Sequence, residues 1–131
     1  MGKDNFVHVI ASDCILSTTI GRTLIDLGYV DPERLRESNP KKGQIVVSKV
    51  GSTEIFSVMT RENHFEPTTP ENLYYSLLGL REALRQVDTK TVRISGAGDG
   101  LDKLPANILR NIIRQIFVGS DVTFTLCSGE V

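Results

Sequence analysis

Short apolar and β-branched runs alternate with segments of helical periodicity along the chain, and this alternation limits the possible folds most strongly. The sequence predicts strands at residues 6–10, 44–50, 54–59, 91–95 and 122–126. Helical patterns lie near residues 20–27, 70–84 and 105–117, with a further short helical turn that starts at Asp31. This order is typical of one mixed sheet covered by helices. We therefore expect a single α/β domain over residues 1–131, built as a three-layer α/β/α sandwich.

The ends of the predicted helices carry recognisable signals. Thr69 is placed to cap the long helix, Pro70 occupies its first position, and Gly28 can close the first helix. Apolar residues repeat at helical and strand spacing, so a core can be predicted from the pattern. The residues expected in the core are Ile10, Leu24, Val46, Leu77, Ile94, Ile112 and Phe124.

Charge and cysteine content exclude several classes of protein. Fifteen Lys and Arg residues oppose sixteen Asp and Glu residues, for a net charge of −1. Proteins that grip long nucleic acids usually carry a basic surplus, whereas a small anion can be held by backbone amides alone. Cys14 and Cys127 form no metal-binding spacing, so we expect no metal and no cofactor. No apolar run is long enough to span a membrane, and the polar first residues predict an intracellular protein, cytoplasmic or nuclear.

A glycine-rich run follows the predicted strand at residues 91–95. Gly96, Gly98 and Gly100 lie between this strand and a helix, where backbone N–H groups can approach a phosphate. The spacing does not fit the dinucleotide-binding fingerprint, because Leu101 stands where a glycine would be needed. Glycine loops between strands and helices are common, so a ligand-binding loop and a plain connection both remain open.

Two aspartates follow predicted strands and invite two interpretations. Asp102 comes after the glycine run, and Asp13 comes after the first strand. A carboxylate beside a phosphate-binding turn can orient water or accept a proton, but one before a helix commonly caps it. Spacing alone favours the capping role for Asp102. His8, inside an apolar run, is predicted to be a core histidine with its hydrogen bonds satisfied.

Four blocks of sequence, in order, resemble the terminal ADP-ribose protein glycohydrolase class of macro domains. Residues 8–14, His-Val-Ile-Ala-Ser-Asp-Cys, resemble the first strand and loop of that class, and residues 43–47 resemble its Gly-Glu-Val-Ala-Val strand. Residues 60–73 resemble its Thr-Lys to Pro-Thr to Asn-Leu region, and residues 98–104 its Gly-Cys-Gly-Leu-Asp-Arg-Leu loop. The resemblance extends from about Asp4 to Leu126.

The resemblance implies an ADP-ribose cleft between two loops. Ligand-binding positions carried over from it are Ser12, Asp13, Thr18, Thr19, Gly21, Arg61, Gly98, Asp99, Gly100 and Leu101. Hydrolysing members release ADP-ribose from modified acidic side chains, with a lysine that attacks the anomeric carbon and an aspartate that assists. The aspartate corresponds to Asp102, which becomes the candidate catalytic residue.

Three departures from the family pattern affect the expected activity. Arg61 occupies the lysine position, and a guanidinium stays protonated, so it cannot act as the same amine nucleophile. Thr18 and Thr19 lie in the segment that aligns with a glycine-rich family loop, where branched side chains replace open backbone. Almost nothing precedes Phe6, so the domain is expected to be N-terminally shortened and to lack the family's first strand and its adenine-recognising aspartate.

Three functions remain open from the sequence. The first is binding of ADP-ribose or a related nucleotide, or of an ADP-ribosylated protein, with at most weak hydrolysis. The second is a degenerate macro fold that serves as a protein interaction module, and the third is an ADP-ribosyl-glutamate hydrolase in which Asp102 orients water. An uncovered sheet edge also predicts either a homodimer or a compensating partner segment.

Overall fold

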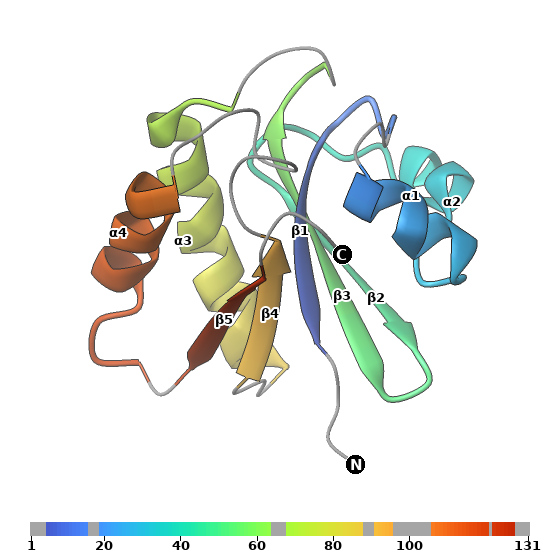
Figure 1. Cartoon of the computed structure of the whole chain (residues 1–131). Coiled ribbons are helices and arrows are strands. Elements are labelled where there is room, and N and C mark those ends of the chain that lie inside the picture. The colour runs from blue at the N-terminus through green and yellow to red at the C-terminus, as the bar shows by residue number, and fades with distance from the viewer. Residues whose placement is uncertain are drawn as a thin grey trace.

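Five strands form one mixed sheet in the order β2-β3-β1-β4-β5 (Figure 1). The computed structural model describes residues 5–15, 19–63, 68–87, 91–95, 106–120 and 122–127. The strands are β1 (Phe6–Ala11), β2 (Ile45–Val50), β3 (Thr53–Arg61), β4 (Thr91–Ser95) and β5 (Thr123–Cys127). All are parallel except β2, which pairs antiparallel with β3 across the turn Gly51-Ser52. Gly51 has a φ of 62°, which suits a two-residue hairpin turn.

Helices cover both faces of this sheet, as the sequence predicted. The helices are α1 (Thr19–Asp26), α2 (Pro32–Glu37), α3 (Pro70–Gln86) and α4 (Ala106–Ile116). The pair α3 and α4 lies against one face, and the pair α1 and α2 lies against the other (Figure 1). The three-layer α/β/α arrangement is therefore confirmed.

Side chains and glycine define the helix ends. The Thr69 hydroxyl accepts a hydrogen bond from the Asn72 N–H at 3.1 Å, which confirms Thr69 as the cap of α3. Gly28, with a φ of 83°, closes the end of α1. Leu27 continues the helical spacing of Ile20 and Leu24 in the sequence, but it is 64% exposed, so it does not belong to the buried face of this helix. The helix ends at Asp26, and the closing turn carries Leu27 away from the sheet.

Two apolar clusters form the core, one on each face of the sheet. The larger cluster joins the sheet to α3 and α4, and the smaller joins it to α1 and α2. Five of the seven expected core residues are buried: Ile10, Leu24, Leu77, Ile94 and Ile112. Val46 and Phe124 are only half-buried, because they lie on the two edge strands and have a neighbouring strand on one side only.

His8 is buried in the middle of β1 on the face that α1 and α2 cover. Its Nε2 lies 2.6 Å from the Ser57 hydroxyl of β3 and shares a hydrogen bond with it. Its Nδ1 has no hydrogen-bond partner among the described residues, so the histidine is satisfied at one nitrogen only. Burial lowers the pKa of His8 from 6.5 to about 4, because the charged imidazolium would lose its hydration.

This buried histidine predicts acid-sensitive stability. The unfolded chain protonates His8 near pH 6.5, whereas the folded protein resists protonation down to about pH 4. The free energy of unfolding should therefore fall by about 3 kcal/mol between these two pH values. Urea denaturation across this range measures the fall, and His8→Gln should flatten the slope. An equal pH dependence in both proteins would contradict the prediction.

Candidate functional site

The carboxyl ends of four parallel strands lie along one edge of the sheet. β1, β3, β4 and β5 end there at Ala11, Arg61, Ser95 and Cys127. In open α/β sheets, ligands bind outside this edge, because the loops that leave the strands converge there. The predicted ligand-binding residues all lie on segments that follow or end these strands. This edge is therefore the candidate site.

The turn after β1 is fastened to the end of β3 by its backbone. The Ser12 N–H donates to the Arg61 carbonyl at 2.8 Å, and the Asp13 N–H donates to the Glu62 carbonyl at 3.1 Å. The Ser12 hydroxyl also donates to the Glu62 carbonyl, at 3.3 Å. A register shift between Ile10 and Ala11 precedes these bonds. The backbone of Ser12 and Asp13 is thus fixed at this edge of the sheet.

A tight turn then directs the chain away from β1. The Cys14 N–H donates to the Ala11 carbonyl at 3.0 Å, and Cys14 has a φ of 62°, unusual for a residue with a side chain. Asp13 stabilises the turn, because its carboxylate accepts a hydrogen bond from the Ile15 N–H at 3.0 Å. The Asp13 side chain therefore has a local structural role in this structure.

Cys14 is fully buried beneath this turn and packs in the smaller core cluster. Its Sγ lies 3.5 Å from the Ser12 carbonyl, to which the thiol can donate. Burial is the main cause that raises the pKa of Cys14; Asp13 raises it further, and Arg36 opposes the shift. The thiol consequently stays protonated near neutral pH, and a protonated thiol is a poor nucleophile.

The helix α1 begins shortly after this turn. Thr19 and Gly21, two of the predicted ligand-binding residues, lie in its first turn. The first N–H groups of a helix have no partner within the helix, and the helix dipole makes this end favourable for anions. The described structure thus places a helix start where the family alignment suggested a phosphate-binding loop.

Arg61 ends β3 and is buried, with only 4% of its surface exposed. Its Nη1 donates to the hydroxyls of Thr60 at 3.4 Å and Thr68 at 3.3 Å, and these two hydroxyls lie 2.9 Å apart. The predicted strand ended at Met59, but pairing of Arg61 with Ala11 extends β3 to Arg61. The network connects the end of β3 to the residues that precede α3.

Other predicted site residues lie outside the part of the chain that the structure describes. They are Thr18, Gly98, Asp99, Gly100, Leu101 and Asp102. Sequence reasoning did not identify Thr60 and Thr68 as partners of Arg61, nor the backbone bonds between the two loops. Hydrogen bonds between main-chain groups do not depend on residue type, so the sequence could not indicate them. The hydroxyls of Thr60 and Thr68, in contrast, are visible in the sequence as possible partners of Arg61. Among the described residues no acidic, histidine or cysteine group is arranged to hold a metal ion, and no helix is long and apolar enough to cross a membrane.

Comparisons with known proteins give relatives in both sequence and structure. No family model matches the sequence. The chain is 25% identical over 123 residues to the ADP-ribose glycohydrolase OARD1 of Bos taurus, and 24% identical to that of Homo sapiens. The alignments cover 94% of this chain and 80% of either relative.

Solved macrodomains share the fold. The macrodomain of Thermus aquaticus DarG superposes with a TM-score of 0.81 at 12% identity, over 100% of this chain and 91% of that chain. DarTG of Thermosipho africanus, solved in complex with ADP-ribose, superposes with a TM-score of 0.78 at 10% identity. That match covers 96% of this chain and 38% of the larger protein. Identities this low establish the fold alone.

Proposed function

Because the chain has the macro-domain fold and resembles ADP-ribose glycohydrolases in sequence, we propose that it binds ADP-ribose or a closely related nucleotide. The observation that carries the proposal is the arrangement at the carboxyl edge of the sheet. A turn fixed to the end of β3 leads there into the start of α1. A protein that carries ADP-ribose as a modification would present the same group to this edge.

The proposed ligand is an anion that backbone groups can recognise. A diphosphate beside the first turn of α1 would meet the N–H groups of the helix start and the positive end of the helix dipole. Ser12 and Asp13 lie on the preceding turn, where their backbone is held by β3. We assign Gly98, Asp99, Gly100 and Leu101 to the opposite side of the ligand, on the segment that follows β4. These assignments rest on the family resemblance.

The proposed activity includes at most weak hydrolysis. Arg61 replaces the family's lysine, and a guanidinium offers no lone pair for attack on the anomeric carbon. Its Nη1 is engaged by the hydroxyls of Thr60 and Thr68, so this end of the side chain supports the junction between β3 and α3. Asp102 is left as the candidate that orients water.

A calorimetric titration with ADP-ribose tests the proposal, with AMP and ADP as matched ligands that lack the distal ribose. Saturable heat with ADP-ribose at a stoichiometry of one is the expected result. The absence of heat from a folded sample at high protein concentration would contradict the proposal. That result would favour the second function, a macro fold that acts as a protein interaction module and binds no nucleotide.

A further inference from the structure

The strand β2 forms an edge of the sheet and pairs only with β3 among the described residues. The Met59 N–H donates to the Gln44 carbonyl at 3.0 Å, so the pair Gln44–Met59 is hydrogen-bonded. Bonded and non-bonded pairs alternate in antiparallel strands, so Val46, Ser48 and Val50 also turn their backbone groups toward β3. The N–H and C=O groups of Ile45, Val47 and Lys49 therefore point outward.

The outer edge of β2 is suited to pairing with another strand. Val47 and Val50 are 42% and 39% exposed, although both belong to the sheet. The six residues of β2 contain no proline, and Lys49 is their only charge, so the usual devices that block strand pairing are nearly absent. The edge presents a backbone template with β-branched side chains.

A groove of about 670 Å³ runs between the outer edge of β2 and the helix α3. On the helix it is lined by Gly79, Glu82, Ala83 and Gln86. The helix lies close to the strand at Gly79, where a Cβ would be 3.7 Å from the Gly43 carbonyl and from Ile45, in ordinary van der Waals contact. Side chains of an added strand would enter this groove beside Ile45 and Val47.

We propose that β2 pairs antiparallel with β2 of a second copy of this chain, about a two-fold axis at Val47. This register places Val47 opposite the partner's Val47, and Ile45 opposite the partner's Lys49. All three outward-facing residues of each strand then form hydrogen-bonded pairs, so the edge is self-complementary. The two sheets join into one continuous sheet across the axis.

Charge complementarity favours a second copy as the occupant. Lys49 lies opposite Glu54 and on the same face of β2 as Ile45 and Val47. Ile45 and Val47 lie opposite Val58 and Phe56, which belong to the core cluster under α3, so Lys49 also lies on the face that α3 covers. Beside the partner's Ile45, Lys49 would meet the partner's Glu82, which lines the partner's groove. The two-fold symmetry repeats this ion pair, so the dimer contains two of them.

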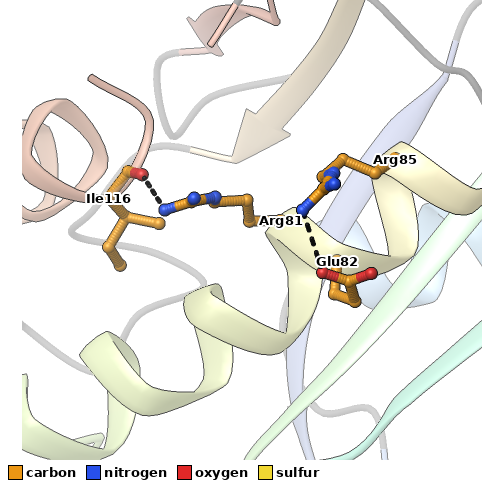
Figure 2. A network of polar contacts seen from close by, with 4 residues as sticks. All are labelled: Arg81, Glu82, Arg85 and Ile116. Atoms are coloured by element: carbon orange, nitrogen blue, oxygen red, sulfur yellow. Dashed lines mark hydrogen bonds and ion pairs between the residues drawn. The ribbon is translucent and has the colours of Figure 1, made fainter. Parts of the chain in front are cut away.

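Glu82 lies on a helix that is fixed on the sheet, and its carboxylate is accessible for such a pair. Its carboxylate lies 3.4 Å from Arg85 on the same helix, an exposed contact that contributes little and can be shared (Figure 2). Arg81 on the preceding position donates to the Ile116 carbonyl at 3.0 Å and ties α3 to α4 (Figure 2). The helix that carries Glu82 is thus fixed on the sheet.

Sedimentation equilibrium over a wide range of protein concentration tests the proposal. We expect a reversible dimer that Glu82→Lys weakens by about tenfold, because two ion pairs become two repulsions. The double variant Lys49→Glu/Glu82→Lys restores the opposite charges and should recover the dimer. Arg110→Glu on α4 reverses a charge away from this edge and serves as the control.

A backbone variant tests the strand pairing itself. Val47→Pro removes an outward N–H and leaves the bonds between β2 and β3, because proline is tolerated on edge strands. We expect a folded monomer by circular dichroism and sedimentation. Monomeric wild type at every concentration, or a dimer that neither Val47→Pro nor Glu82→Lys weakens, would overturn the proposal. Failure of Lys49→Glu/Glu82→Lys to recover the dimer would overturn the assigned register.

Discussion

Gly100→Val is expected to weaken ADP-ribose binding by about tenfold or more, a loss near 1.4 kcal/mol at the lower limit. Gly100 belongs to the glycine-rich segment between β4 and α4, which begins after Ser95 at the carboxyl edge of the sheet. A valine there adds a branched side chain where the backbone should meet the diphosphate, and it resists a positive φ. Gly100→Ala should produce a smaller loss of affinity.

The control for this experiment is Gly79→Ala on α3. An added Cβ at Gly79 makes only ordinary van der Waals contacts, so the variant changes a glycine without touching the carboxyl edge. Calorimetric titration of the three variants and the wild type gives the affinities, and circular dichroism checks the fold. If Gly100→Val binds as tightly as the wild type and stays folded, this segment is not part of the site.

The fold could be predicted from the sequence because its signals are local. Alternating strand and helix patterns, the Thr69-Pro70 helix start and the closing Gly28 each depend on a few neighbouring residues. Burial was less predictable at the sheet edges. Val46 fits the pattern of a core residue, but its exposure depends on which strand lies at the edge, and only the strand order settles this.

The sequence named residues for the candidate site, but it did not predict the contacts that these residues make. The resemblance selected Ser12, Asp13 and Arg61, which the structure brings to one edge of the sheet. The burial of Arg61 beside Thr60 and Thr68 depends on Thr68 lying close to the end of β3 in the folded chain. Likewise, the contact of His8 with Ser57 depends on strand register across 49 positions. Neither contact could be predicted from the positions of the two residues in the sequence.

Hydrolysis of glutamate-linked ADP-ribose is expected to be weak or absent, about 10²-fold or more below that of lysine-bearing relatives. The reaction needs an attacking group at the anomeric carbon and stabilisation of the departing charge. Arg61 supplies a positive charge without a nucleophilic lone pair, and its Nη1 is hydrogen-bonded to two threonines. Asp102 alone would have to orient the attacking water.

Three variants separate the contributions of Asp102 and Arg61 to hydrolysis. Each is assayed for release of ADP-ribose from a protein that carries it on acidic side chains. Asp102→Ala should lower any residual release by about 10²–10⁴-fold, the usual contribution of a positioned general base. Arg61→Lys restores the family's amine but should not restore full release, because Thr18 and Thr19 still replace the glycine-rich family loop. Glu33→Ala on α2 removes an exposed carboxylate that is not among the candidate site residues, and this variant should release ADP-ribose as the wild type does. Rapid and complete release by the wild type, abolished in Asp102→Ala, would contradict weak activity and establish water attack assisted by Asp102 as the mechanism.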